Sequence, residues 1–139
     1  PSGKLALAAW AEPAKNPWAT TASSVINKLL NLTPPPPDTP GVFRHSTAQK
    51  LTEMMVASGS IDVKQEEVTG EMVFNSPEHY WEFVTDVVAP VATPLSTASA
   101  VVREQAKQAV LAATSDYSKD GKVVFNWSCW IATGSKKRF

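Results

Sequence analysis

The sequence predicts an α/β fold in which about three strands, one of them antiparallel, combine with about four helices. The first strand is Lys4–Trp10, whose nearly continuous apolar residues are typical of a strand covered on both faces. A helix that ends at Gly59 and leads into a strand is the usual half of an α/β unit. A third strand is predicted over residues 122–133, where apolar residues recur at every second position. In isolation, the same elements would be classed as α+β.

The length and composition indicate one globular domain, residues 1–139. Hydrophobic residues make up 43% of the chain and charged residues 19%, values typical of a folded protein with its own core. Thirteen basic and thirteen acidic residues give a net charge of zero, which favours self-association. Basic residues cluster only at Lys136-Lys137-Arg138, so nucleic acid is not an expected partner.

The single cysteine and the hydropathy pattern bear on the compartment. Cys129 alone allows neither an internal disulfide nor a cysteine-rich zinc site, which favours a reducing, cytoplasmic location. No apolar run approaches the ~18 residues that a membrane-spanning helix needs, so no membrane span is expected. Because apolar Lys4–Trp10 lies at the very start of the chain, the sequence is interpreted as the back half of something larger.

Two helices are predicted before the middle strand. Asn16-Pro17 is a cap followed by a first-turn proline, and opens an amphipathic helix over residues 17–31. Four consecutive prolines from Pro34 then predict a stiff polyproline-like loop, with a partner motif as the alternative. Ser46 and Gln49 form a capping box for the second helix. A strand follows over 61–68 and is expected to resume near 71–74.

Two more helices are predicted before the last strand. Ser76-Pro77 opens a helix that Pro90 stops, and a loop containing Pro94 leads to a helix near residues 99–117. A turn at Lys119-Asp120-Gly121 precedes the last strand. One face of that strand is expected to be apolar and to bury a structural thiol; its members are Val123, Phe125, Trp127, Cys129 and Ile131.

In this order, the parts resemble the C-terminal half of class I S-adenosylmethionine-dependent methyltransferases, in the branch that acts on small molecules such as quinone and lipid precursors. Pro1–Leu5 resembles the proline-glycine turn that leads into the family's fifth strand, and Asn16–Trp18 the segment after it. Leu51–Val63 is similar to the helix that enters strand six, with Ser60 where the family usually has an aromatic residue. Ser76–Phe83 resembles the helix inserted before strand seven, and Trp130–Lys136 resembles strand seven itself.

The resemblance implies a partial Rossmann-like domain that runs from strand five to strand seven, with a helical insertion at about 76–118. It places strand seven antiparallel between strands five and six, and it implies S-adenosylmethionine as cofactor. The family's glycine-rich turn and ribose-binding acid are not found, since the six glycines form no G-x-G. The cofactor site therefore cannot be carried onto this chain, and transfer of a methyl group is expected only together with the missing half.

The resemblance and the aromatic content suggest an acceptor pocket. Methyl transfer needs mainly an aligned acceptor and exclusion of water, so aromatic residues matter more than acids. His45 is a candidate for a general base or a polar contact, the alternative being an exposed loop histidine. The two histidines have no metal-ligand spacing, so no metal is expected. The expected substrate-binding residues are Trp10, Trp18, Phe43, His45, Tyr80 and Trp81, with Phe83 as a further aromatic candidate.

Two other functions remain open at this stage. One is a non-catalytic, self-associating domain from a truncated gene, which binds a small ligand or serves a structural role. The other is an unrelated α+β protein that encloses a small apolar ligand, which a closed apolar cavity without an exposed sheet edge would favour. A homodimer joined through residues 4–10 or the adjacent helices is expected, because an apolar edge strand recruits another chain.

Overall fold

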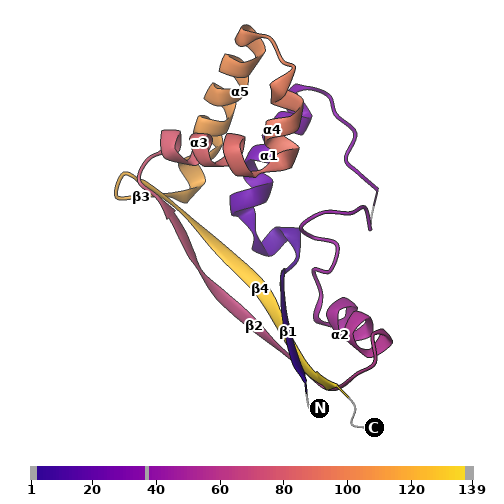
Figure 1. Ribbon diagram of the computed structural model, residues 1–139. Helices are drawn as coiled ribbons and strands as arrows, with labels where there is room; N and C mark the ends of the chain where they lie inside the picture. The colour runs from indigo at the N-terminus through magenta and orange to yellow at the C-terminus, as the bar shows by residue number, and fades with distance from the viewer. Residues whose placement is uncertain (1–2, 37, 137–139) are drawn as a thin grey trace. The chain divides into compact units, whose positions relative to one another are not determined.

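The computed structural model describes residues 3–36 and 38–136 (Figure 1). The described part is a mixed α/β fold, as the sequence predicts. Two short 3-10 helices, Pro13–Lys15 and Ser115–Tyr117, accompany the main elements. The main elements are β1 (Lys4–Trp10), α1 (Pro17–Leu29), α2 (Ala48–Ala57), β2 (Ser60–Phe74), α3 (Pro77–Val87), α4 (Ala89–Ser96), α5 (Ala100–Ala113), β3 (Ser118–Lys119) and β4 (Lys122–Lys136).

The last strand lies in the middle of the sheet. The strand order is β1-β4-β2, and the short β3 pairs with β4. β4 runs antiparallel to β1 and β2, so these two strands point the same way on either side of it (Figure 1). Pairing of β1 with β4 is unbroken from Lys4 opposite Ser135 to Trp10 opposite Cys129. Within the described residues, β1 pairs with a strand on one edge only.

The chain divides into two compact units. Unit 1 comprises the described residues within Pro1–Asn16, Pro36–Gly70 and Trp127–Phe139, and unit 2 comprises Pro17–Pro35 and Glu71–Asn126. Both β2 and β4 contribute residues to each unit. The expectation of a single domain stays a prediction.

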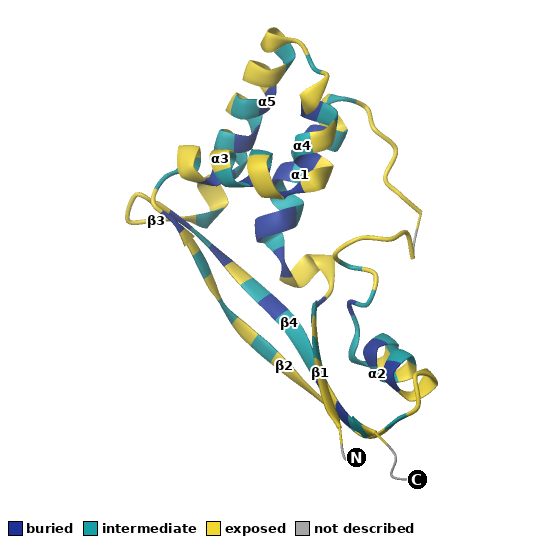
Figure 2. Ribbon diagram, in the orientation of Figure 1, coloured by how far each residue is buried: buried dark blue, intermediate teal, exposed yellow. Residues whose placement is uncertain are grey.

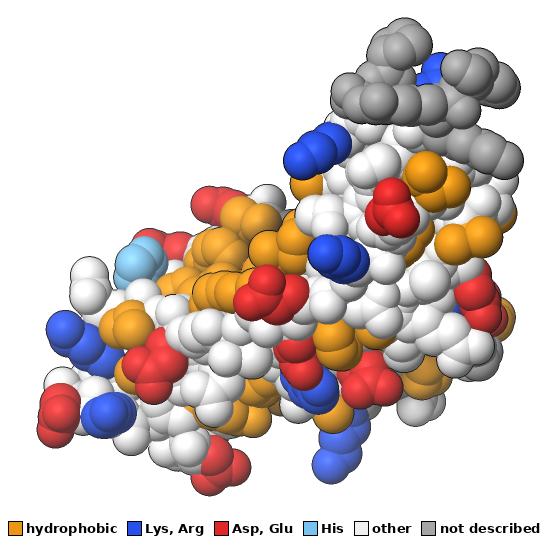
Figure 3. All heavy atoms as spheres, turned by 90° about the horizontal axis from the view of Figure 1, so that it is seen from below, with side chains coloured by type: hydrophobic (Ala, Val, Ile, Leu, Met, Phe, Trp, Pro, Cys, Tyr) orange, Lys and Arg blue, Asp and Glu red, His pale blue; other side chains and the backbone are white. Residues whose placement is uncertain are grey.

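On the face shown in Figure 3, acidic and basic side chains are interspersed, in keeping with their equal numbers.

In unit 1, one side of α2 supplies most of the hydrophobic core (Figure 2). Leu51 and Met55 are each 1% exposed and pack with Ala132 of β4. A Cβ atom on Gly134 would lie 2.9 Å from Met55 Cε and 3.2 Å from Ser60 Cβ. The missing side chain at Gly134 therefore allows α2 and the start of β2 to approach β4 closely.

In unit 2, four helices pack around an aromatic cluster. α1 contacts α4 and α5, and α3 contacts the same two helices. The ring centroid of the fully buried Tyr80 lies 5.2 Å from that of Phe74 and 4.8 Å from that of Phe125. These tilted and edge-on arrangements are the favourable ones for aromatic pairs.

The prediction that alternate residues from Val123 to Ile131 form the buried face of β4 is wrong for the part of the strand in unit 1. Val123 and Phe125 are fully buried in unit 2, but in unit 1 the buried β4 residues include Ser128 and Ala132. Cys129 is only half-buried, contrary to the expectation of a buried thiol. Alternate residues of a strand face opposite sides, and α2 packs on the side of Ala132. An alternating pattern of apolar residues alone could not reveal which side each segment buries.

The helix ends show two further corrections. The cap of α2 is Thr47 rather than Ser46: Lys50 N–H donates to Thr47 Oγ1 at 3.2 Å. The segment expected as a loop beyond Pro90 instead forms α4, with Pro90 in its first turn, where an N–H has no intrahelical partner. The predicted cap at Ser76 is confirmed, because its Oγ accepts from His79 N–H.

Strand and turn boundaries are close to those predicted. β2 is one strand that continues through Gly70 rather than two segments, and α5 ends at Ala113 rather than near 117. Gly59 has φ of 86°, which confirms the left-handed cap. Asp120 and Gly121 have φ of 50° and 77°, as a tight turn between β3 and β4 requires.

Beyond Trp10, the side chain of Asn16 continues the pairing with β4. Ala11 N–H donates to Ser128 O at 2.9 Å. Asn16 Nδ2 donates to the same oxygen at 2.9 Å and to Ala11 O at 3.1 Å. Ser128 N–H in turn donates to Asn16 Oδ1 at 3.1 Å. The buried Asn16 amide therefore presents to Ser128 the donor and acceptor that a neighbouring strand would present.

We predict that Asn16→Ala lowers the free energy of unfolding by about 3 kcal/mol, because Ser128 N–H is then buried without a partner and Ala11 O loses its donor. Urea unfolding measures the change. Asn126→Ala, at an exposed position of β4, is the control and should change stability by less than about 0.5 kcal/mol. Equal stability of the two variants would contradict the role assigned to Asn16.

Candidate functional site

The predicted site residues are divided between the two units. Trp10, Phe43 and His45 belong to unit 1. Unit 2 contains the remaining ones: Trp18, Tyr80, Trp81 and Phe83.

Trp10, at the carboxyl end of β1, forms an aromatic corner with Trp127 of β4. The two ring centroids are 6.2 Å apart and the rings are nearly perpendicular, at 83°. The Trp127 ring lies over Gly70 of β2, where a Cβ atom would be only 2.6 Å from Trp127 Cζ2. In the sequence, Trp127 can be recognised only as one of the alternating apolar residues of the last strand. A glycine inside a strand, Gly70, was the available signal for this close approach.

A polar group lies in the same unit, around Glu67. Glu67 Oε1 accepts from Lys15 Nζ at 2.6 Å and from Ser128 Oγ at 2.7 Å. The hydrogen bond from Lys15, followed by that from Ser128, lowers the pKa of Glu67, and the same carboxylate raises the pKa of Lys15. Both groups therefore stay charged at neutral pH. A carboxylate stabilised in this way is a poor general base, so the group is better suited to structure than to proton transfer.

Phe43 and His45 lie in the turn that precedes α2, and both are half-buried. An ion pair between Asp38 and Lys50, at 2.6 Å, links this segment to the helix. The His45 side chain makes no hydrogen bond with any residue that the structure describes. Its role as a base or substrate contact stays a prediction. Residues 3–36 and 38–136 contain no group of three or more His, Cys, Asp or Glu side chains placed to hold a metal ion.

In unit 2, Tyr80 and Trp18 come together in the core. The Tyr80 hydroxyl donates to Trp18 O at 2.9 Å and accepts from Ala22 N–H at 3.3 Å. Burial raises the pKa of Tyr80. Trp18 is 6% exposed and contacts Phe83 edge-on, whereas Trp81 is half-buried. Tyr80 and Trp18 thus have packing roles, and a substrate role for any of these residues stays a prediction.

Comparison with models of known protein families finds no match, and comparison with curated proteins finds none either. No helix in the described part of the chain combines the length and apolar character needed to cross a bilayer. Any functional assignment therefore depends on the strand order, the placement of the residues above and the sequence motifs.

We predict that Tyr80→Phe lowers the free energy of unfolding at pH 7 by about 1.5 kcal/mol, through loss of two buried hydrogen bonds. It should also weaken the alkaline destabilisation of the protein. The folded state raises the pKa of Tyr80, so the unfolded chain releases its proton first and stability falls as pH rises above about 10.

Urea unfolding between pH 7 and 11 tests this prediction. Tyr117→Phe is the matched control, because Tyr117 is the other tyrosine of the chain and is less buried. An identical loss of stability above pH 10 in the original protein and in Tyr80→Phe would contradict it.

Proposed function

We propose that this chain is the substrate-side half of a class I S-adenosylmethionine-dependent methyltransferase that acts on a small molecule. The observation that supports this proposal is the strand order β1-β4-β2. The resemblance implies that the last strand enters antiparallel between strands five and six, and β4 lies antiparallel between β1 and β2. Chain order alone would favour pairing of sequential strands, so this placement is a specific point of agreement.

Two further features support the same proposal. The helices between β2 and β4 occupy residues 77–117, close to the expected insertion at about 76–118. Trp10 lies at the carboxyl end of β1, and ligands of α/β sheets bind outside the carboxyl ends of the strands. In this proposal, the aromatic corner of Trp10 and Trp127 contributes an apolar wall to the acceptor site. The single cysteine supports a reducing, cytoplasmic compartment.

The cofactor does not fit the residues present. S-adenosylmethionine needs backbone donors from a glycine-rich turn and a carboxylate for its ribose, and the sequence contains no G-x-G. The residues of this chain therefore do not form the cofactor site by themselves. The proposed part of the chain is to align the acceptor and exclude water, which are the main protein contributions to methyl transfer.

We predict that the 139-residue chain alone binds S-adenosylmethionine and its demethylated product more weakly than about 1 mM in calorimetric titration. If a glycine-rich strand-turn-helix is encoded directly upstream, the longer chain should bind both at micromolar concentration. Micromolar binding by the 139-residue chain would refute the proposal of a missing half. An upstream region without such a segment would favour a non-catalytic domain.

A self-associating domain is the second candidate, and the edge of β1 favours it. No residue of β1 is fully buried, and Leu5 is 44% exposed. The strand carries a charge only at Lys4, contains no proline and pairs without a bulge, so it lacks the usual protection of edge strands. We propose antiparallel pairing of two copies of β1 centred on Leu7, which sets Ala6 opposite Ala8 of the partner subunit.

We predict that light scattering gives a dimeric mass, twice the 15.0 kDa of one chain. Ala6→Lys with Ala8→Lys should weaken the dimer at least about tenfold, because like charges then face each other across the pair. Ala57→Lys with Ala112→Lys adds the same charge at exposed helical positions and should leave the mass unchanged. A monomeric mass of the unaltered chain at high concentration would refute the dimer.

A further inference from the structure

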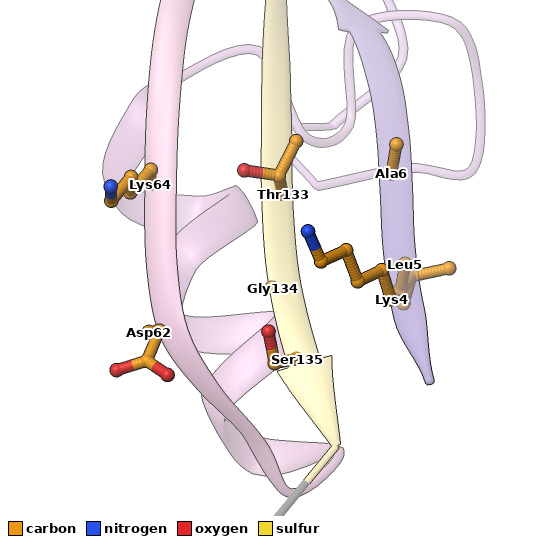
Figure 4. Close-up of a pocket in the computed structure, with 8 residues that line it drawn as sticks. All are labelled: Lys4, Leu5, Ala6, Asp62, Lys64, Thr133, Gly134 and Ser135. Atoms are coloured by element: carbon orange, nitrogen blue, oxygen red, sulfur yellow. The ribbon is translucent and has the colours of Figure 1, made fainter. Parts of the chain in front are cut away.

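An open hollow of about 380 Å³ lies on the sheet of unit 1, near the amino-terminal end of β1 (Figure 4). Lys4 and Ala6 line it, whereas the alternate residues Leu7 and Ala9 pack against the cluster formed by α2. The hollow therefore lies on the sheet face opposite α2. It is also remote along β1 from Trp10, so it is separate from the proposed acceptor site.

Polar residues from three strands line this hollow. Lys4 of β1, Lys64 of β2, and Thr133 and Ser135 of β4 contribute two ammonium groups and two hydroxyls. Figure 4 shows the Lys4 side chain extending from β1 toward β4, on the side of Thr133. None of these four side chains forms a hydrogen bond or ion pair with another side chain in the described part of the chain. Their donors are available to a ligand, and ammonium and hydroxyl donors together suit a phosphate group.

The Asp62 carboxylate limits the negative charge of a ligand that this hollow can bind. It also lines the hollow, so two ammonium groups and one carboxylate leave a net charge of +1. Asp62 has φ of 53°, a left-handed conformation that is uncommon inside a strand and gathers at functional positions. A singly charged phosphodiester would neutralise this net charge, whereas a doubly charged phosphate monoester would leave an excess negative charge beside the Asp62 carboxylate.

We propose that this hollow binds a phosphodiester group, with Lys4 and Lys64 as its charge partners and Thr133 and Ser135 as neutral donors. The phosphodiester comes either from a phospholipid headgroup or from a soluble molecule. Both sources present the same singly charged group.

The test compares two probes and two double variants of the full chain. Dimethyl phosphate is the soluble probe, followed by NMR titration, and phosphatidylglycerol vesicles are the lipid probe, followed by co-sedimentation with phosphatidylcholine vesicles as reference. Lys4→Gln with Lys64→Gln should weaken binding about 25-fold, about fivefold for each lysine. Lys119→Gln with Lys122→Gln removes the same charge from exposed positions of unit 2 and should change binding less than about twofold.

Each outcome decides the proposal. Binding of dimethyl phosphate that is lost in Lys4→Gln with Lys64→Gln supports it with a soluble ligand, and the same loss on phosphatidylglycerol vesicles alone supports it with a lipid headgroup. Asp62→Asn should strengthen the binding severalfold, which gives a second readout if the double lysine variant folds poorly. The proposal is overturned if neither probe binds, or if both double variants bind equally, since the basic run 136–138 would then explain the attraction.

Discussion

The side-chain amide of Asn16 is the interaction on which the organisation of unit 1 depends. It bonds both the N–H and the C=O of Ser128 and also the C=O of Ala11, at the point where β1 leaves the sheet. A buried amide with all of these partners stabilises one register of β1 against β4, because a shift would leave several polar groups unpaired. The same register sets Trp10 beside Cys129 and positions the aromatic corner with Trp127.

Small residues then determine how closely α2 and the Trp127 ring approach the strands of unit 1. Gly134 leaves room for Met55 of α2, and Gly70 leaves room for the ring of Trp127. A side chain at either position would meet a neighbouring atom at less than 3 Å. The core of unit 1 and its aromatic corner therefore both depend on the absence of a Cβ atom in a strand, at opposite faces of the same sheet.

Much of the fold follows from the sequence, because its signals are local. The Ser76 cap, the left-handed Gly59 and the turn at Asp120-Gly121 each involve only residues that are close in the sequence, so a single sequence is enough to find them. The side of β4 that is buried could not be predicted, since it depends on which helix covers each segment. Asn16 was identified as a helix cap, but its pairing with Ser128 joins residues 112 apart and leaves no pattern in the sequence.

The candidate site was less predictable for the same reason. Trp10 was singled out from composition and resemblance. Its contact with Trp127, and the close approach of the Trp127 ring to Gly70, can be recognised only once the pairing of β1, β4 and β2 is known. Tyr80 was expected at a pocket on the basis of aromatic content, yet its hydroxyl is held between Trp18 O and Ala22 N–H in a buried core. Aromatic residues at helical spacing serve packing and binding equally well, so spacing alone does not separate the two.

The pairing of the first strand with the last has a consequence for how the protein is made. A ribosome produces β1 before β4, and residues 11–121 lie between the two paired strands in the chain. Until β4 emerges, the apolar residues of β1 have no partner in the sheet, and contacts of such long sequence separation form slowly. The sheet of unit 1 therefore cannot form until β4 has been made. During that interval the nascent chain depends on low concentration or on chaperones to keep β1 from pairing with the wrong strand.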